Sequence, residues 1–313
     1  MEGSSGSATN IQNLPFNFDL QAHCFVRKGD ADLKLDLPVS VTLQITRRCN
    51  LECIYCSEDL QLREYDTDTV KRMVDNLSGV SRIIVSGGEP TLRRDLVEIL
   101  KYIKDKGFPT IAVATNATVI TKSLAKELSS VLSYADVTID GTPEIHNKIR
   151  GQFDKVYTGI RNLVEAGVDV SLVNVLLSDN KSDLVDVCQM ADNLGVRKLK
   201  ILSPIRKGRG ADILSHGLSS EELSETYEML KLVKRERGWK VKITLTDWER
   251  VREGHAILIH PDGDIVASPV PSEATCIKKF GNILTEHITE AWKQYPYVQN
   301  HIRKYFEESL LVC

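Results

Sequence analysis

Short apolar stretches alternate with amphipathic stretches over the first 210 residues of the chain. The apolar stretches are rich in β-branched residues, which is typical of buried strands, whereas the stretches between them repeat apolar residues with helical spacing. The predicted strands are residues 39–45, 82–85, 110–114, 135–139, 168–177 and 196–202. The predicted helices are residues 67–77, 94–106, 121–132, 156–166 and 181–194.

Capping residues mark the ends of these elements. Gly107, Gly167 and Gly195 each follow a predicted helix, and glycine readily adopts the left-handed conformation that ends one. Thr121 and Asn180 are expected to be N-caps. Strands that alternate with helices in this way indicate an α/β fold, with a parallel sheet covered by helices. Six such units favour an open, partial (β/α)6 TIM-like barrel, with a Rossmann-type open sheet as the alternative.

The pattern changes after about residue 210. A long helix is expected at residues 219–237, because Ser219-Ser220-Glu221-Glu222 is a capping signature. Pro261-Asp262-Gly263 is typical of a tight turn and predicts a β-hairpin. The other expected elements are strands at 240–245, 256–260 and 264–267 and helical structure from 288 to 306. We interpret this region as a small C-terminal α+β appendage that closes one side of the barrel.

These patterns divide the chain into three parts. Residues 1–38 form an N-terminal extension, whose first ten residues are small and polar and are expected to be flexible. Residues 39–210 form the partial barrel, and residues 211–313 form the C-terminal region.

Composition and charge exclude several classes of protein. The 313 residues carry a formal net charge of −3, with 42% hydrophobic and 27% charged residues, which is ordinary for a soluble globular protein. No apolar run approaches the roughly 20 residues that a membrane span needs, and the N-terminus lacks the apolar stretch of a secretion signal. We therefore expect a cytoplasmic protein without a membrane partner. The slightly negative net charge does not indicate a basic surface that would bind nucleic acid.

Cysteine usage changes this picture most. Seven cysteines, an odd number in a chain with no export signal, make a disulfide framework improbable. Cys49, Cys53 and Cys56 form a C-x3-C-x2-C motif just after the first predicted strand. This spacing lets three thiolates converge on one iron–sulfur cluster, and three ligands leave one iron of a four-iron cube without a protein ligand. A structural zinc ion or an electron-transfer cluster is the alternative, but both prefer four ligands.

At this motif the chain resembles the radical S-adenosylmethionine (SAM) superfamily, in which an aromatic residue, here Tyr55, precedes the last cysteine. The resemblance covers about residues 39–210. It implies one [4Fe–4S] cluster whose open iron is chelated by SAM, and an electron donor of the flavodoxin or ferredoxin type. It also implies that SAM is cleaved to methionine and a 5′-deoxyadenosyl radical, which abstracts a hydrogen atom from the substrate.

The resemblance extends to polar motifs at the ends of later strands. Gly87-Gly88-Glu89-Pro90 resembles the family segment that binds the amino group of SAM, although by itself it is a strand-to-helix turn. Thr138 stands where family members often have Ser, and Arg150 matches an arginine near the SAM carboxylate. An exposed arginine in a solvated loop is the alternative for Arg150. The residues expected to bind SAM are Tyr55, Gly87, Gly88, Glu89, Pro90, Thr115, Asn116, Thr138, Asp140, Arg150 and Asn174.

The C-terminal region resembles the SPASM/twitch extension of radical SAM maturases, which holds auxiliary iron–sulfur clusters. The cysteines expected there are replaced by other residues at 251–254 and 268–269, and only Cys276 and Cys313 remain. We therefore expect no auxiliary cluster and a remnant scaffold that binds substrate. Cys276 is interpreted as a loop residue, a catalytic hydrogen-atom donor or a redox thiol, whereas Cys24 and Cys188 are expected to be structural.

The functional prediction is hydrogen abstraction from a peptide substrate, in maturation or natural-product modification. One alternative is an epimerase, dehydratase or decarboxylase of a sugar or nucleoside, which the missing auxiliary ligands favour. The alternatives from other classes are a non-catalytic iron–sulfur redox protein and a zinc-binding structural protein.

Overall fold

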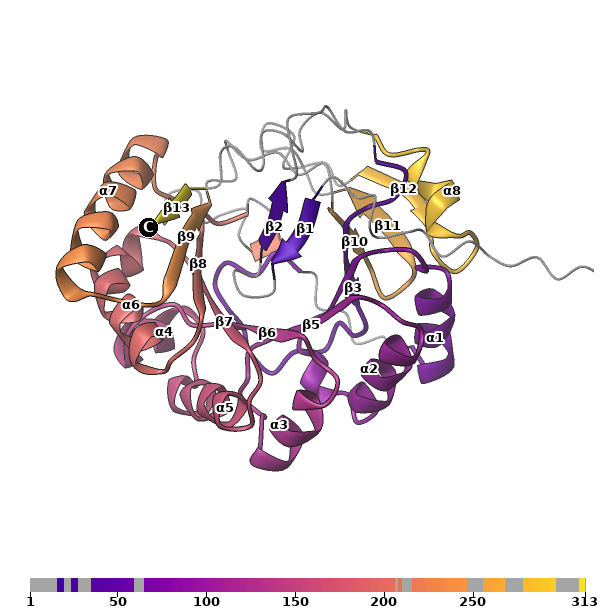
Figure 1. The fold of residues 1–313 in the computed structure, drawn as a ribbon, viewed down its shortest axis with the longest axis horizontal. Coiled ribbons are helices and arrows are strands. Elements are labelled where there is room, and N and C mark those ends of the chain that lie inside the picture. Colours follow the sequence, from indigo (N-terminus) through magenta and orange to yellow (C-terminus); the bar gives the residue numbers. More distant parts are fainter. Residues whose placement is uncertain are drawn as a thin grey trace, which may run out of the picture.

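The computed structural model describes most of the chain between residues 35 and 296. The described residues are 16–19, 24–27, 35–58, 65–205, 208–209, 216–246, 256–267, 278–296 and 310–312. Within them, one large sheet of 11 strands has the order β12-β11-β10-β3-β4-β5-β6-β7-β8-β9-β13. This sheet curves into an open arc with helices on its outer side (Figure 1).

All six strands predicted in the first part of the chain are present and pair in parallel in sequence order. They are β3 (Ser40–Gln44), β4 (Arg82–Ser86), β5 (Thr110–Thr115), β6 (Tyr134–Thr138), β7 (Val170–Val175) and β8 (Lys198–Leu202). Short helices and 3-10 turns follow the strands, so that every strand points its carboxyl end to the same edge of the sheet. The predicted partial barrel is confirmed, and its sheet is not closed.

The five predicted helices are also present, with ends that differ by a few residues from the prediction. They are α1 (Thr67–Asp75), α2 (Leu96–Asp105), α3 (Lys122–Ser129), α5 (Phe153–Glu165) and α6 (Leu184–Asn193). Thr121 is the N-cap of α3, as predicted, because its side chain accepts a hydrogen bond from the Leu124 N–H. The prediction of Asn180 as an N-cap is wrong, because Asn180 lies inside the 3-10 helix η3 (Ser178–Asp183) that precedes α6.

Two further short elements were not predicted. The helix α4 (Pro143–Ile149) begins with a proline at its first turn, where proline has no hydrogen bond to lose. The 3-10 helix η2 (Pro90–Leu92) follows β4 in the same way. Both elements lie just after a strand, at the edge of the sheet where the candidate site is found.

The C-terminal region adds strands to both edges of the same sheet. The helix α7 (Ser220–Arg237), capped by Ser219 as predicted, leads into β9 (Lys242–Thr246), which pairs in parallel with β8. The predicted hairpin forms at the other edge, where its first strand pairs in parallel with β3. The remaining elements are β10 (Ala256–Ile259), β11 (Asp264–Ala267), β12 (Lys278–Asn282), α8 (Ile288–Trp292), β13 (Leu310–Val312) and an N-terminal hairpin of β1 (Phe16–Asp19) and β2 (Cys24–Arg27).

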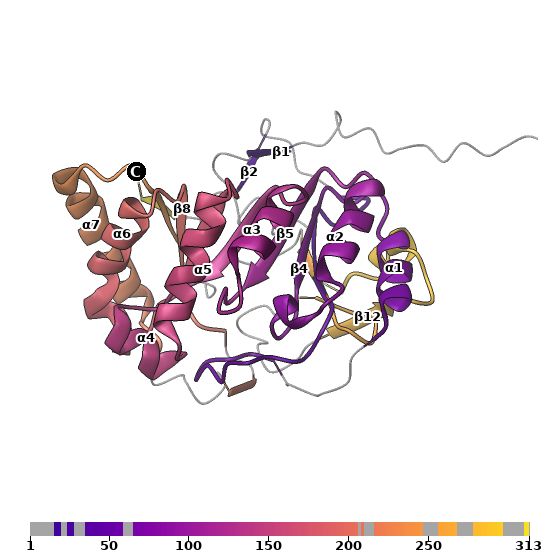
Figure 2. The ribbon, with the colours of Figure 1, turned by 90° about the horizontal axis from the view of Figure 1, so that it is seen from below.

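Alternation along the strands separates a packed face from a polar face. Val41 and Leu43 of β3 are fully buried in the core that the outer helices cover, whereas Thr42 and Gln44 face the inside of the arc. Figure 2 shows the same helices from below, side by side along the outer surface. No described helix combines the length and the apolar character that a membrane crossing requires.

Candidate active site

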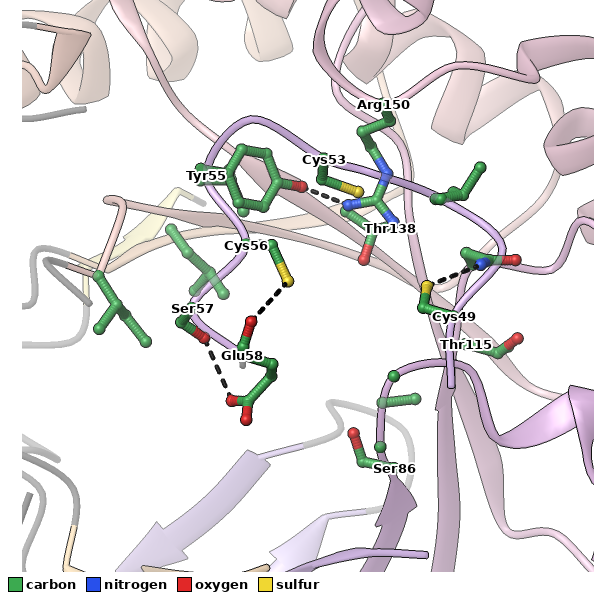
Figure 3. Close-up of a pocket in the computed structure, with 18 of the residues that line it drawn as sticks. Cys49, Cys53, Tyr55, Cys56, Ser57, Glu58, Ser86, Thr115, Thr138 and Arg150 are labelled. Atoms are coloured by element: carbon green, nitrogen blue, oxygen red, sulfur yellow. Dashed lines mark hydrogen bonds between the residues drawn. The ribbon is translucent and has the colours of Figure 1, made fainter. Parts of the chain in front are cut away.

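A cavity of about 350 Å3 opens at the carboxyl ends of the parallel strands. Its wall brings together the three cysteines of the motif and residues from β3 to β8 (Figure 3). Of the residues expected to bind SAM, those that line it are Tyr55, Gly87, Gly88, Thr115, Asn116, Thr138 and Arg150. Glu89, Pro90, Asp140 and Asn174 are buried beside the cavity and do not line it. Cys276 and Cys313 lie outside the described residues.

The loop after β3 presents the three thiols to this cavity. It turns at Cys53, where the Cys56 N–H donates to the Cys53 carbonyl at 3.1 Å, and the Ile54 N–H donates to the Ile149 carbonyl at 3.1 Å. The first bond closes the turn, and the second fixes the loop against the end of α4. Cys49, Cys53 and Cys56 are free thiols in the structure, and burial raises the pKa of the Cys49 and Cys53 thiols.

The donor set fits an iron–sulfur cluster better than a single metal ion. Three thiols face one cavity from a single loop, which suits a cube that spreads its ligands over separate corners (Figure 3). Among the described residues, no three His, Cys, Asp or Glu side chains come close enough together to hold one ion. The cavity continues past the thiols toward Thr138 and Arg150, where a second group has room to bind.

The Gly87-Gly88 turn lies directly against the cysteine loop. The Gly88 N–H donates to the Thr46 carbonyl at 2.8 Å, and the Glu89 N–H donates to the Arg48 carbonyl at 2.7 Å. A Cβ on Gly87 would lie 2.3 Å from the Thr46 oxygen, and a Cβ on Gly88 would lie 2.3 Å from the Arg48 oxygen. Both glycines are therefore required for close approach between two backbone segments that line the cavity.

We expect Gly88→Ala to push the turn away from the cysteine loop and to reduce cluster loading. Overpacking of this kind typically costs about 1–3 kcal/mol of stability. The measurement is iron per chain after anaerobic reconstitution, together with the unfolding free energy. Gly107→Ala is the matched control, because nothing lies within 4 Å of its added Cβ and only its φ of +80° is strained. Equal iron contents in the two variants would contradict the steric explanation.

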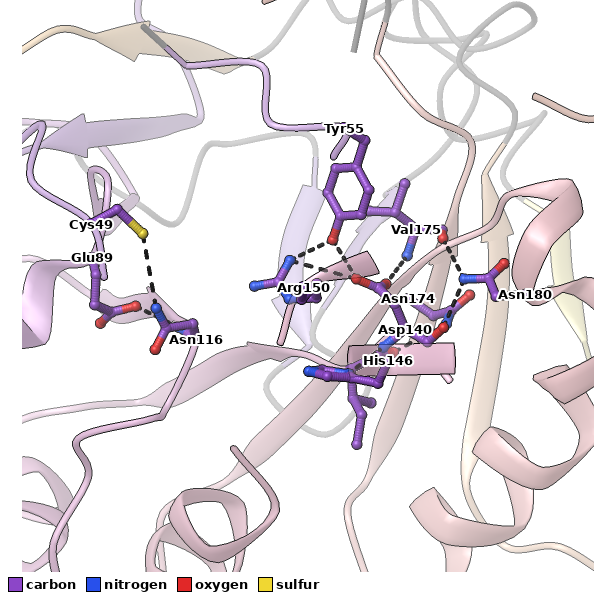
Figure 4. A network of polar contacts seen from close by, with 11 residues as sticks. Cys49, Tyr55, Glu89, Asn116, Asp140, His146, Arg150, Asn174, Val175 and Asn180 are labelled. Atoms are coloured by element: carbon purple, nitrogen blue, oxygen red, sulfur yellow. Dashed lines mark hydrogen bonds and ion pairs between the residues drawn. The ribbon is translucent and has the colours of Figure 1, made fainter. Parts of the chain in front are cut away.

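The Glu89 carboxylate is a buried anchor for the neighbouring strand end. It is 1% exposed and accepts hydrogen bonds from the N–H and Oγ1 of Thr91, from Thr115 Oγ1 at 2.6 Å and from the Asn116 N–H at 2.6 Å. Burial raises its pKa, although these hydrogen bonds act in the opposite direction. Asn116 in turn reaches the Cys49 sulfur at 4.0 Å, so Glu89 supports the cysteine loop indirectly (Figure 4).

Arg150 follows α4 and is largely buried, so the alternative of an exposed arginine in a solvated loop is wrong. Its side chain is 9% exposed, and its Nη1 donates to the Tyr55 hydroxyl and lies 3.5 Å from Asp140 Oδ2. The Tyr55 hydroxyl donates to the same Asp140 carboxylate. Burial raises the pKa of Tyr55 and of Asp140; for Arg150 burial acts to lower the pKa, but the two acidic neighbours raise it overall.

His146 holds the backbone of Asp140 in place. Its Nδ1 accepts the Asp140 backbone N–H at 3.1 Å, which places the proton of the neutral ring on Nε2. Burial lowers its pKa to about 4, so the ring is neutral at physiological pH. The Nε2 atom has no hydrogen-bond partner among the described residues, and the ring packs edge-on to Phe153 at 5.4 Å.

The sequence did not connect Asn180 to the site. Its side-chain amide donates to the carbonyls of Asp140 at 2.8 Å and Val175 at 2.9 Å, and its oxygen accepts the Leu177 N–H at 2.8 Å. Asn174 donates to the Ile139 carbonyl at 3.0 Å, and its oxygen is buried without a partner among the described residues. The sequence signal that could have indicated this role is the position of Asn180, five residues after β7 ends at Val175.

Comparisons with known proteins agree with this geometry. Residues 43–191 match the sequence model of the Radical SAM superfamily. The chain therefore carries a radical SAM domain over these residues. Enzymes of this family use a [4Fe–4S] cluster together with SAM, and similar structures include ones with bound AdoMet.

The similar sequences are named for several reactions. An Fe-coproporphyrin III synthase of Methanosarcina barkeri is 31% identical over 220 residues, which are 66% of this chain and 55% of that protein. A probable GTP 3′,8-cyclase of Methanocaldococcus jannaschii is 33% identical over 167 residues, which are 50% of this chain and 56% of that protein. The chain thus spans about half the length of the curated relatives it matches.

Solved structures share the fold over more of the chain. Streptococcus suis SuiB bound to its precursor peptide SuiA superposes with a TM-score of 0.72 at 13% identity, covering 88% of this chain and 67% of SuiB. Native anSMEcpe with bound AdoMet has a TM-score of 0.62 at 19% identity, covering 85% of this chain and 82% of that protein. At these identities the likeness concerns the fold alone.

Proposed function

We propose that this chain holds a [4Fe–4S] cluster through Cys49, Cys53 and Cys56 and cleaves SAM reductively to start hydrogen abstraction from a substrate. The observation that carries the proposal is the meeting of these thiols with the Gly87-Gly88 turn on the wall of one cavity. When bound, the cluster supplies the electron that breaks a carbon–sulfur bond of SAM and yields the radical. The protein's part is to bind, orient and shield the reacting groups.

Different residues around the cavity bind different groups of SAM. The backbone of Gly87 and Gly88 lines the cavity, where a carbonyl group can accept a hydrogen bond from the ammonium group of SAM. Arg150 offers a guanidinium group to its carboxylate, and Thr138 offers a hydroxyl group. Tyr55, Thr115 and Asn116 complete the wall. The residues assigned a supporting role behind it are Glu89, Pro90, Asp140 and Asn174.

Reductive cleavage separates this proposal from the alternatives. We expect anaerobically reconstituted protein, given SAM and dithionite, to release 5′-deoxyadenosine, slowly in the absence of substrate. Liquid chromatography with mass detection measures the product, and protein without dithionite is the control. A non-catalytic iron–sulfur protein would hold iron but release no product above this control. A zinc protein would show zinc and no iron in metal analysis.

For the substrate we propose a peptide, with a small molecule as the second candidate. The peptide proposal is supported by the fold likeness to SuiB, which covers 88% of this chain and extends beyond the superfamily match. The second candidate is supported by the sequence relatives, whose names refer to heme, coproporphyrin and GTP chemistry. A screen of deuterated peptides and small molecules, read out as deuterium in 5′-deoxyadenosine, distinguishes them.

Two further assignments remain proposals. The first is an electron donor of the flavodoxin or ferredoxin type for the cluster. The second is a SPASM-like C-terminal region without an auxiliary cluster, in which Cys276 is a hydrogen-atom donor. The residues that would carry the second assignment, 251–254, 268–269 and Cys276, lie outside the described residues.

A further inference from the structure

The hydroxyl group of Tyr55 joins three segments that are far apart in the sequence. Tyr55 lies between two cluster cysteines, Asp140 follows β6, and Arg150 follows α4. The hydroxyl donates to the Asp140 carboxylate and accepts from Arg150 Nη1, and the guanidinium lies 5.8 Å from the Tyr55 ring (Figure 4). An aromatic residue needs no hydroxyl to pack beside a cluster, so the two hydrogen bonds require a separate explanation.

We call the contacts among Tyr55, Asp140 and Arg150 the junction. Within it, Asp140 is held firmly by its own neighbours. Its side chain is 0% exposed, its Oδ1 accepts the Val175 N–H at 2.7 Å, and its backbone N–H is held by His146 at 3.1 Å. The carboxylate therefore cannot turn without breaking its contact to β7, and the backbone that carries it is held by α4. The Tyr55 hydroxyl, and through it the cysteine loop, is fixed to the sheet at this point.

Arg150 depends on the junction for its orientation. Its side chain is 9% exposed and lines the cavity, and its Nε atom has no hydrogen-bond partner among the described residues. The Tyr55 hydroxyl is the hydrogen-bond acceptor of its Nη1, while Asp140 Oδ2 is at 3.5 Å. Loss of the hydroxyl would leave the buried guanidinium held mainly by a longer ion pair, and free to change its rotamer.

We propose that Tyr55 is a positioning residue, whose hydroxyl holds Arg150 at the angle that binds the SAM carboxylate and couples that arginine to the cysteine loop. The inference rests on the proposed function and adds one element to it: cofactor affinity depends on a phenol group that acts through its hydrogen bonds to Arg150 and Asp140. Tyr55→Phe keeps the ring and removes only the two hydrogen bonds.

The test measures SAM binding to reduced, reconstituted protein by the change in the electron paramagnetic resonance spectrum of the cluster. We expect Tyr55→Phe to raise the Kd for SAM by about tenfold, the effect of one lost hydrogen bond to a charged group, with unchanged iron content. Tyr102→Phe is the matched control, because it removes a hydroxyl that donates to Asp75 on the outer surface. This control should leave the Kd within about twofold of the wild type.

A double-mutant cycle tests whether Tyr55 acts through Arg150. In the Arg150→Gln background, Tyr55→Phe should change the Kd no further. If the two effects instead multiply, Tyr55 acts independently and the inference is overturned. If Tyr55→Phe lowers iron content, Asp140→Asn serves in its place, because it alters the same hydrogen bonds through a residue outside the cysteine loop, and the same non-additivity is expected. If SAM did not change the spectrum of the wild type, the proposed function itself would be refuted. If SAM changed the spectra of the wild type and of Tyr55→Phe with the same Kd, only this inference would be refuted.

Discussion

Replacing any one of Cys49, Cys53 and Cys56 with Ala is expected to abolish stable cluster binding and SAM cleavage. Each thiol lines the same cavity from one loop, and a cluster that keeps one iron open for a cofactor has no spare protein ligand. With two thiolates left, the cluster is lost or held at a small fraction of the wild-type content. The measurements are iron and sulfide per chain, visible absorbance, and 5′-deoxyadenosine formed with SAM and dithionite.

Cys188→Ala is the matched control for removal of a cysteine. Cys188 is 0% exposed in α6, and burial raises its pKa to about 12, so its thiol is an inert part of the core. We expect this variant to keep full iron content and to lose about 1 kcal/mol of stability through the missing sulfur. Wild-type iron content in a Cys49, Cys53 or Cys56 variant would count against that residue as a ligand.

Glu89→Ala is expected to destabilise the fold by about 3–5 kcal/mol, because each buried donor left without its acceptor costs about 1–3 kcal/mol. The change would leave four donors from Thr91, Thr115 and Asn116 without their acceptor in a buried site. It would also release Asn116 from beside Cys49, so cluster loading should fall with stability. Urea unfolding and iron per chain measure the two effects.

Glu98→Ala provides the comparison for loss of an exposed carboxylate. Glu98 lies on α2 and pairs with Lys71 at 2.6 Å on the surface, where such pairs contribute about 1 kcal/mol or less. Its removal should leave iron content unchanged. If Glu89→Ala were no more destabilising than Glu98→Ala, the four hydrogen bonds would have little net value and the anchoring role of Glu89 would be wrong.

Local sequence signals were sufficient for the barrel because each element carries its own pattern. The six strands combine β-branched residues with turn signals, and the helix ends at Gly107, Gly167 and Gly195 all have positive φ. Ser219 and Glu222 form the predicted capping box, with both reciprocal hydrogen bonds present. Such features depend on residues a few positions apart, so they can be recognised without knowing the fold.

The roles of buried polar residues were not predictable in the same way, because their partners are distant in the sequence. The glycines of the Gly87-Gly88 turn were expected to approach a ligand, but their nearest obstacle is the backbone of Thr46 and Arg48. Asn180 was expected to cap a helix from its own segment, yet it bonds to Asp140, 40 positions earlier. The three cysteines were recognisable because their spacing is itself the signal.

The C-terminal strands have a consequence for any attempt to shorten the protein. β12 and β13 are the two outermost strands of the sheet, and both come from the last 36 residues of the chain, 278–313. A fragment that stopped after β8 would leave β3 and β8 as bare borders, with unpaired backbone groups ready to join other molecules. The final third of the polypeptide thus protects the first two thirds from self-association, and truncated versions are expected to precipitate.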